Sequence, residues 1–390
     1  MGRFHSYIHS ALSVLEQYRG EEPLASFLKK FFSAQKKFGS RDRRSVSHLC
    51  YSYFRAAKLF DSRCSAETIL AALFLCTTES NEILAALKPE WNEQAALPVR
   101  EKLSLLGIPA AADKIFPWKE ELSEGIDQES FALSMLVQPD LFLRTRPGMK
   151  RSVLQKLSAA GCHYSLAAEN CIALPNTTPV EKIIELNREA VIQDFSSQRV
   201  GEFLEPVLKG PSFNIWDCCA ASGGKSILAR DILGEAALTV SDVRESILAN
   251  LKKRFRQAGI TKYKACAADL TKPLPGDLLP GNGYSLIIAD LPCTGSGTWS
   301  RTPEQLYYFD TKKTVDYAAL QQKILAVIIP ALKPGGYLLY ITCSVFKKEN
   351  EEIADLIKEQ FHLVLKKMEW LKGYDKKADS MFAALFQLPL

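Results

Sequence analysis

Two cysteines and an aspartate stand where predicted strands end, and these side chains could do covalent chemistry. Asp290 follows the apolar run 284–288, Pro292 cannot continue that strand, and Cys293 comes next in a loop with turn-forming glycines. Cys343 occupies a similar place at the end of GGYLLYITCS. Ligands bind at the carboxyl ends of strands in open α/β sheets. We expect the two strands that precede these cysteines, the fourth and fifth of the sheet, to lie beside its first strand, so that both thiols face one cleft. A random cysteine is more often a small buried hydrophobe, but each of these ends a core strand beside a loop.

A thiolate beside a methyl donor suits methylation at an unreactive pyrimidine carbon. Thiolate addition to carbon 6 of cytosine makes carbon 5 nucleophilic enough to attack a sulfonium methyl group. A base must then remove the carbon 5 proton. Asp290 is placed to hydrogen-bond the exocyclic amine and ring nitrogen if it is protonated, which requires a raised pKa. These residues alone leave open which thiol attacks.

The segment WDCCAASGGKS predicts a tight turn at Gly223 and Gly224 that leads into a helix. It is neither G-x-G-x-x-G nor a P-loop, because Cys219 stands where a P-loop needs its first glycine. The helix N-terminus favours a carboxylate, and the strand-end acids Asp242 and Asp269 suit ribose hydroxyls and an adenine amine. Together these features fit S-adenosylmethionine better than a pyrophosphate. The turn alone would only mark a sharp strand–helix connection.

The composition bounds the class of protein. The 390 residues suggest two or three domains, and 47% hydrophobic with 24% charged residues is ordinary for a soluble protein. Ten cysteines without a C-x-x-C pair argue against a zinc site and a disulfide scaffold, and they favour a reducing compartment. No run has the length of a membrane span, and the N-terminus is not a signal peptide. We therefore expect a cytoplasmic protein with neither metal nor membrane contact.

Three domains are predicted, at 1–135, 136–190 and 191–390. Apolar residues recur at helical spacing in the first, with a helix start after Gly39 and no strand pattern. The second is a small α/β linker domain, with expected strands at 141–145, 164–166 and 171–174 and an expected helix at 150–160. From Ser212, strands alternate with helices, which predicts a mostly parallel, doubly wound α/β sheet with an antiparallel pair at the end. The expected strands of this sheet are 213–218, 237–241, 263–268, 284–289, 337–342, 361–368 and 381–388, and the expected helices are 226–233, 246–258, 318–332 and 351–360.

The net charge of +5 is unevenly placed. Between Lys29 and Lys58, nine basic residues, Lys36 among them, face a single acid, Asp42. This basic cluster suits a polyanion partner such as RNA. A solvent-exposed helix face explains the cluster equally well. The candidate phosphate contacts, which include residues of the linker and of the loop after Cys293, are Arg41, Arg43, Arg44, Arg144, Arg146, Lys150, Arg151 and Arg301.

From about Gln193 onward the chain resembles the Nop/Sun (Fmu-type, RsmB-like) RNA cytosine-5 methyltransferases. The motifs are DCCAASGGK from Asp217, DLPCTGSGTWSRTPE from Asp290 and YITCSVFKKENEE from Tyr340. FGSRDRRSVSHLCYSYFR, from Phe38, resembles a NusB-like helical RNA-binding domain, and residues 138–190 correspond to an RRM-like linker.

This resemblance implies a Rossmann-like class I methyltransferase fold and a monomer that forms 5-methylcytosine in RNA, most often 16S ribosomal RNA. It makes Cys343 the nucleophile on carbon 6 and Cys293 the helper that releases the product, with Asp290 touching cofactor and base. The residues that it assigns to S-adenosylmethionine are Cys219, Ala220, Ala221, Ser222, Gly223, Gly224, Lys225, Asp242, Asp269 and Asp290.

The sequence departs from the family pattern at a few positions. Ser222 replaces the usual proline of the cofactor loop, which makes the loop less stiff, and Arg146 replaces an asparagine of the linker. A non-catalytic RNA-binding or ribosome-assembly factor with the same fold is the alternative, and the intact thiols weigh against it. A methyltransferase acting on an amine of adenine or glutamine would need an aromatic ring where Cys293 stands.

Overall fold

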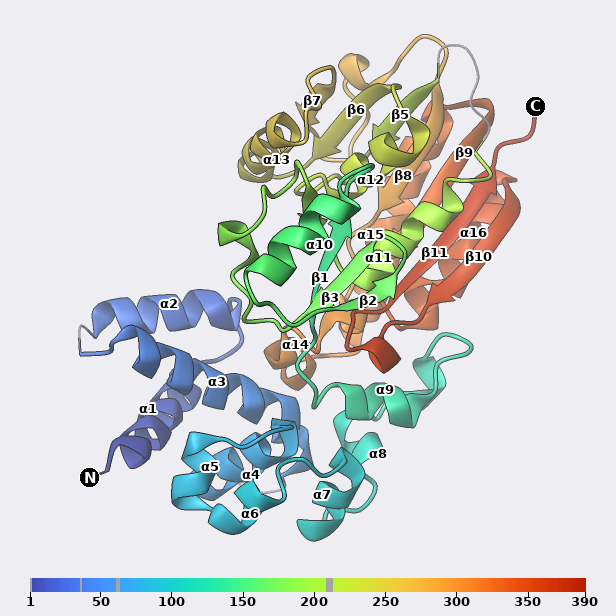
Figure 1. Cartoon of the computed structure of the whole chain (residues 1–390). Coiled ribbons are helices and arrows are strands. Elements are labelled where there is room, and N and C mark those ends of the chain that lie inside the picture. Colours follow the sequence, from blue (N-terminus) through green and yellow to red (C-terminus); the bar gives the residue numbers. More distant parts are fainter. Residues whose placement is uncertain (1, 36, 61–63, 208–212) are drawn as a thin grey trace. The chain divides into compact units, whose positions relative to one another are not determined.

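The structure is a computed structural model that describes residues 2–35, 37–60, 64–207 and 213–390 (Figure 1). Lys36 and Ser212, named above, lie outside the described residues. The chain divides into two compact units. The first comprises Met1–Leu122, Ile126–Gln138 and Thr298–Asp310, and the second comprises Ser123–Gly125, Pro139–Gly297 and Thr311–Leu390. The two segments predicted as separate domains at 136–190 and 191–390 therefore share one unit for most of their length, and part of the loop after Cys293 belongs to the helical unit.

The first unit is helical throughout its described residues, as predicted. Helix α3 begins at Ser40 after Gly39, whose amide donates to the Asp42 carboxylate at 2.9 Å. That bond satisfies one of the amides that a helix start leaves free. The helices are α1 (Arg3–Gln17), α2 (Leu24–Ala34), α3 (Ser40–Ala56), α4 (Ala66–Cys76), α5 (Glu82–Leu87), α6 (Pro89–Glu93), α7 (Val99–Leu105), α8 (Ala111–Ile115), α9 (Gln128–Ser134) and α14 (Pro303–Tyr307).

The linker segment forms a four-stranded antiparallel sheet in the order β2-β3-β1-β4. The predicted strands are present as β1 (Leu141–Thr145), β2 (Ser165–Ala168) and β3 (Cys171–Leu174), and α10 (Lys150–Ala159) lies between β1 and β2 in the chain. Strand β4 (Ala190–Ile192) was not predicted, because three residues are too short to show an alternating pattern. It is followed by α11 (Phe195–Arg199).

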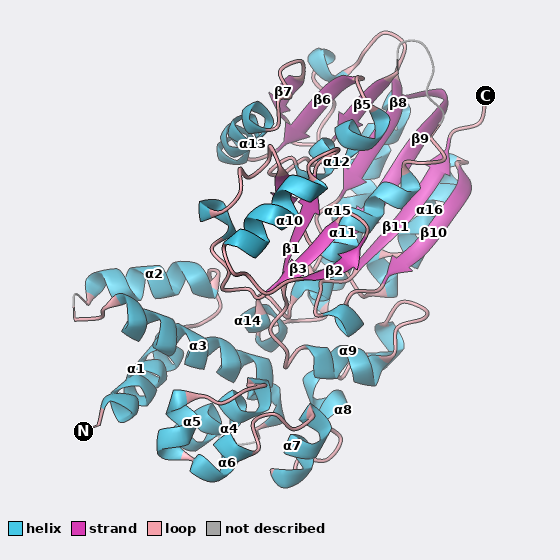
Figure 2. Cartoon of the chain, viewed as in Figure 1, coloured by secondary structure: helices cyan, strands magenta, loops and turns pink. Residues whose placement is uncertain are grey.

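The C-terminal segment, residues 191–390, forms a seven-stranded sheet in the order β10-β11-β9-β8-β5-β6-β7 (Figure 2). Strands β9, β8, β5, β6 and β7 pair in parallel in that order. Strand β11 pairs antiparallel with β9, and β10 pairs antiparallel with β11, as predicted. The strands are β5 (Asn214–Asp217), β6 (Ala237–Asp242), β7 (Lys264–Ala267), β8 (Tyr284–Asp290), β9 (Leu332–Thr342), β10 (Val364–Leu371) and β11 (Met381–Gln387).

Helices cover both faces of this sheet. On β5, Ile215 belongs to the core that packs on α12 (Gly224–Leu233) and α13 (Glu245–Gln257), and its neighbour Trp216 belongs to the opposite core. That second core includes α15 (Lys312–Ile328) and α16 (Glu351–Phe361). Both faces of β5 and β8 are buried, which explains why these strands read as continuous apolar runs.

Two expectations about this domain need correction. Helix α15 ends at Ile328 rather than at residue 332, because Pro330 lacks the amide that would continue the helix. We expected the fourth and fifth strands both to lie beside the first, but only β8 pairs with β5, and β9 lies on the far side of β8. Because β8 and β9 are neighbours, the loops that carry the two thiols still follow adjacent strands.

Within the described residues, no helix is long and apolar enough to cross a membrane.

Candidate active site

The carboxyl ends of the parallel strands bring the predicted cofactor and thiol residues to one edge of the sheet. Asp242 and Asp290 close β6 and β8, Asp269 follows β7, and Cys343 follows β9. Asp217, which ends β5, was not among the predicted site residues. In a doubly wound sheet this edge is where ligands bind.

The cofactor loop between β5 and α12 is tightly folded. Gly223 has φ +80°, and a Cβ placed on it would lie 2.6 Å from Cε1 of Phe255, so only glycine fits there. The amide of Gly223 donates to Ala220 O at 2.8 Å, and the amide of Ala221 donates to the Asp242 carboxylate at 3.1 Å. The loop therefore turns on itself and is tied to the neighbouring strand.

Asp242 and Asp269, the two acids predicted to bind the nucleoside, accept hydrogen bonds from residues two positions further along the chain. The Asp242 carboxylate accepts from the amide of Arg244 at 2.9 Å and from its Nε at 3.1 Å. Asp269 accepts from the amide of Thr271 at 3.1 Å and from its hydroxyl at 2.7 Å, and these bonds lower the pKa of Asp269. Arg244 is a solvent-facing side chain, 59% exposed, so a ligand could share or replace its contact with Asp242.

Lys225, in the first turn of α12, reaches across to β8. Its Nζ lies 2.6 Å from Oδ2 of Asp290. Burial opposes the charge of Lys225, but the Asp290 carboxylate outweighs it and raises the lysine pKa, and Cys343 adds to this effect. This pairing explains a cation at a helix N-terminus, where the helix dipole alone disfavours it. The expected contact of Asp290 with a base stays a prediction.

The two thiols lie side by side. Sγ of Cys293 is 3.3 Å from Sγ of Cys343, and both cysteines are free and half-buried. Contact with Cys343 and burial raise the pKa of Cys293 well above its ordinary value. The Cys343 turn is also fixed by Gly297, whose amide donates to Cys343 O at 2.8 Å and whose missing side chain leaves room for Ser380 O.

Sequence reasoning missed Glu349, which joins the two cysteine turns. Its carboxylate accepts from the amide of Thr294 at 2.8 Å and from the Thr294 hydroxyl at 2.6 Å, and also from the hydroxyl of Ser344. Thr294 follows Cys293 and Ser344 follows Cys343. Glu349 is fully buried, and burial raises its pKa. The KKENEE run after Cys343 contained this acid, but nothing in the run indicated its partners.

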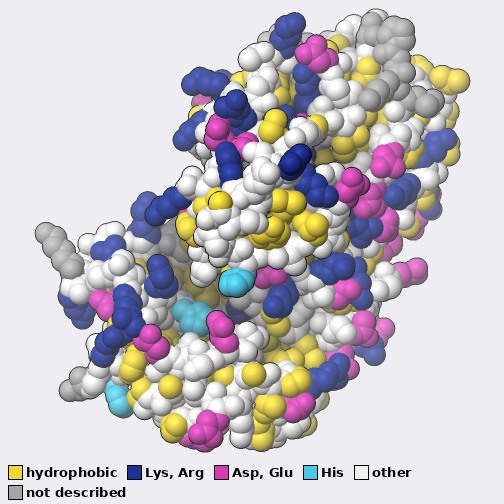
Figure 3. Space-filling view, in the orientation of Figure 1, with side chains coloured by type: hydrophobic (Ala, Val, Ile, Leu, Met, Phe, Trp, Pro, Cys, Tyr) yellow, Lys and Arg dark blue, Asp and Glu magenta, His cyan; other side chains and the backbone are white. Residues whose placement is uncertain are grey.

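The candidate phosphate contacts are placed in different ways. In the helical unit, Arg41 binds the Glu82 carboxylate at 2.7 Å and Nε of Arg43 donates to Phe38 O at 3.0 Å, whereas Arg44 is exposed. On the face shown in Figure 3, Lys and Arg side chains are interspersed with acidic ones. Arg301 belongs to the same unit, and its amide donates to Thr298 O at 2.8 Å.

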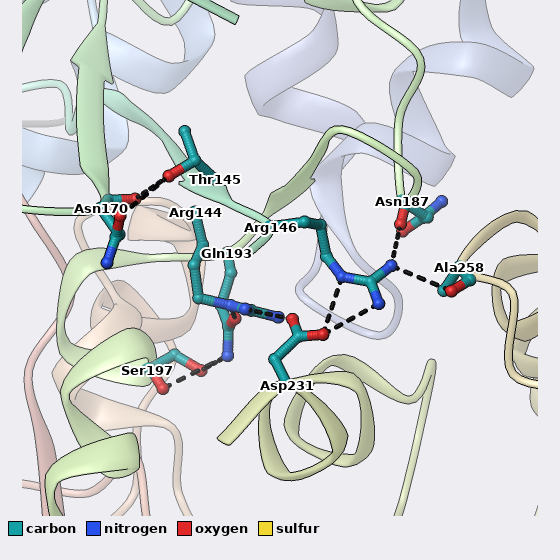
Figure 4. A network of polar contacts seen from close by, with 9 residues as sticks. All are labelled: Arg144, Thr145, Arg146, Asn170, Asn187, Gln193, Ser197, Asp231 and Ala258. Atoms are coloured by element: carbon teal, nitrogen blue, oxygen red, sulfur yellow. Dashed lines mark hydrogen bonds and ion pairs between the residues drawn. The ribbon is translucent and has the colours of Figure 1, made fainter. Parts of the chain in front are cut away.

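Arg144 and Arg146 lie in the second unit, and both bind Asp231 of α12 (Figure 4). Arg144 is only 5% exposed, so its guanidinium group is turned away from solvent. Lys150 and Arg151 begin α10. RNA contacts by any of these residues stay predictions. Among the described residues, no group of three or more His, Cys, Asp or Glu side chains could hold a metal ion.

Comparison with known proteins indicates a family. Residues 204–386 match the family model described as 16S rRNA methyltransferase RsmB/F. This part of the chain is therefore similar to the RsmB/F family. A ribosomal RNA small subunit methyltransferase B from Xylella fastidiosa (strain 9a5c) is 29% identical over 265 residues, which are 65% of this chain and 60% of that protein. The same-named protein of Enterobacter sp. (strain 638) is 31% identical over 51% of this chain and 46% of its own length. The chain thus spans less than two thirds of these RsmB relatives.

Solved structures support the fold of the chain. The crystal structure of PH0851 matches 98% of both chains with a TM-score of 0.69 and 17% identity. The crystal structure of NSun6 from Pyrococcus horikoshii with SFG matches 71% of this chain and 96% of its own, with a TM-score of 0.57 and 13% identity. These likenesses confirm the predicted class I methyltransferase fold.

Proposed function

We propose that this chain is an S-adenosylmethionine-dependent RNA methyltransferase that forms 5-methylcytosine in ribosomal RNA of the small subunit, working as a cytoplasmic monomer. The observation that carries the proposal is the pair of sulfur atoms, Cys293 and Cys343, 3.3 Å apart at the edge of the sheet. The match of residues 204–386 to the RsmB/F family model supports the RNA substrate. If the two cysteines only packed as small buried hydrophobic residues, their sulfur atoms would not need to be paired at the edge of the sheet where ligands bind.

The residues of the cofactor loop fit S-adenosylmethionine, which would supply an electrophilic methyl group. The sharp turn at Gly223 brings backbone to the ligand side without a side chain, and α12 starts at the next residue. The N-terminus of this ten-residue helix suits the methionine carboxylate. Asp242 would accept from the ribose hydroxyls after Arg244 gives way. Asp269 would lie toward the adenine.

In the proposed reaction, the Cys343 thiolate forms a bond to carbon 6 of cytosine, and the electron pair of the carbon 5–carbon 6 double bond becomes available at carbon 5. After carbon 5 gains the methyl group, a base removes its proton, the double bond re-forms and the carbon–sulfur bond breaks. Lys225 is close enough to Cys343 for that cysteine to contribute to the raised pKa of the lysine. Cys293, kept as a neutral thiol by its raised pKa, can donate its proton to the sulfur that leaves. This gives the two thiols their separate roles.

The decisive experiment compares Cys343→Ala with Cys293→Ala on small-subunit ribosomal RNA. Cys343→Ala should abolish methylation and form no adduct, and Cys293→Ala should accumulate a protein–RNA adduct that survives denaturant. Cys162→Ala, which removes a free thiol of the linker, is the matched control and should behave as wild type. Full turnover by Cys343→Ala would overturn the mechanism. Calorimetry with S-adenosylmethionine separates the enzyme from a non-catalytic assembly factor, because the latter should not bind it.

A further inference from the structure

Helix α13 contacts the cofactor loop through three of its side chains. The missing Cβ of Gly223 leaves room for Phe255 and Leu251 of that helix. From the same helix, Nη1 of Arg254 donates to the Ser222 carbonyl at 2.9 Å and to its hydroxyl at 2.6 Å. One guanidinium group therefore fixes both the backbone and the side chain of Ser222. This is the position at which the proteins that the chain resembles carry proline.

Arg254 is in turn oriented by Asn187 of the linker segment. Its Nε donates to Oδ1 of Asn187 at 3.0 Å, and Nδ2 of Asn187 donates to Gln257 on α13 at 2.8 Å. The carbonyl of Asn187 accepts from Arg146 at 2.7 Å, as Figure 4 shows. Asn187 has φ +67°, a left-handed conformation that asparagine tolerates better than most residues. All its polar groups are thus engaged, because its amide also donates to Ala190 O at 2.7 Å.

Asp231 of α12 anchors the far end of this network (Figure 4). Its carboxylate accepts from Nε of Arg146 at 2.9 Å and from Nη1 of Arg144 at 2.6 Å, and it is 6% exposed. The network therefore runs from α12 through Arg146, which directly follows β1, to Asn187 and on to Arg254. Among the described residues, the hydrogen-bond acceptors of Arg254 are the neutral oxygens of Ser222 and Asn187. Hydrogen bonds to these neutral oxygens, rather than an ion pair with a carboxylate, hold the guanidinium group in place.

We infer that Arg254 is a positioning residue that stiffens the cofactor loop in place of a proline, and that the linker segment acts on the cofactor site through Asn187. The inference deepens the proposed function, and its test by S-adenosylmethionine binding rests on that function. A proline stiffens a loop through its fixed φ, and a two-point hydrogen bond to Ser222 restricts the same residue from outside. The linker is then part of the cofactor site's support, in addition to any contact that it makes with RNA.

The test is a cycle of variants at Ser222 and Arg254 in the full chain. Arg254→Met keeps the aliphatic stem but loses the hydrogen bonds, and it should weaken S-adenosylmethionine binding by about tenfold. Ser222→Pro in the same chain should restore most of that loss, which a general folding defect would not allow. Arg256→Met, at an exposed site on α13, is the matched control and should bind like wild type. Asn187→Ala should weaken binding less than Arg254→Met.

A second readout needs no ligand, so it decides the inference even if the chain binds no S-adenosylmethionine. Hydrogen exchange of the Ala221 and Gly223 amides, both hydrogen-bonded in the loop, should speed up by about tenfold in Arg254→Met and return in the Ser222→Pro double variant. Equal exchange in Arg254→Met and Arg256→Met would overturn the inference. So would a folded Arg254→Met whose exchange Ser222→Pro leaves unchanged. Failure of ligand binding in wild type with the expected exchange pattern would instead refute the proposed function alone.

Discussion

Sγ of Cys293 and Sγ of Cys343 lie 3.3 Å apart, on loops that follow two adjacent parallel strands. No ring fits between two sulfur atoms at this distance, so a base must approach Cys343 from beside the pair. The two sulfurs are also close enough to reach the about 2 Å of a disulfide after a small loop movement.

Mild treatment with hydrogen peroxide should therefore couple Cys293 to Cys343, with two thiols and one peroxide giving one disulfide and two waters. Methylation should stop and return with dithiothreitol. Mass spectrometry of the tryptic digest should show the two linked peptides in wild type. Their absence from fully inactivated protein would contradict the prediction, and Cys293→Ala is the control that cannot form the link.

Glu349→Gln should slow adduct formation at least about tenfold while leaving S-adenosylmethionine affinity unchanged. The carboxylate accepts hydrogen bonds from both cysteine turns, and a glutamine has only one accepting oxygen to offer. The rate of adduct formation in a Cys293→Ala background, with and without Glu349→Gln, measures the effect.

Glu352→Gln, an exposed position of α16, is the matched control. In enzyme that keeps Cys293 and turns over, a fall in kcat with little change in KM supports positioning of the thiols. An equal loss of cofactor affinity would show instead that Glu349 only stabilises the fold.

The contrast between Cys343 and Glu349 shows what the sequence can reveal. Glycine turns, strand-end acids and thiols are local patterns, and the structure places Cys293 beside Cys343 and Lys225 beside Asp290. The partners of Glu349 come from two loops that only the fold makes adjacent. No spacing in the chain encodes that contact.

The arginines of the linker illustrate the same limit for charge. Sequence gives the sign of Arg144 and Arg146 but not their partner, which is a buried carboxylate eighty-odd residues away, Asp231. The order of the strands was also beyond the pattern, because alternation predicts a parallel sheet but not that β8 separates β5 from β9. Pairing depends on packing between distant segments.

Lys225→Met should reduce methylation strongly, by about a hundredfold, because it leaves the Asp290 carboxylate without its cation and removes the positive charge that faces Cys343. The rate of adduct formation on the same RNA, relative to wild type, measures the loss. Lys225→Arg keeps the charge and should retain more activity than Lys225→Met. Wild-type activity in Lys225→Met would show that the pairing with Asp290 is not needed.

Asp217 gives the fold a pH dependence that a single substitution should remove. It is buried at the end of β5, where Ser226 donates to its Oδ2 at 2.5 Å and its Oδ1 has no hydrogen-bond partner among the described residues. Burial raises the pKa of Asp217 to about 7, from 3.8 in the unfolded chain. The stability that this raised pKa contributes is complete below about pH 4 and is lost as the pH rises through about 7.

Asp217→Asn should therefore flatten the decline of unfolding free energy between about pH 4 and about pH 8, by up to about 4 kcal/mol. Urea unfolding at pH values across this window, followed for wild type and variant, measures the difference. Asp269→Asn is the control with the opposite sign, because the pKa of Asp269 is lowered and its contribution disappears in acid. Parallel stability curves for wild type and Asp217→Asn would show that Asp217 does not titrate in this window. The same variant retains the hydroxyl of Ser226 as a partner, so a loss of folding is not expected.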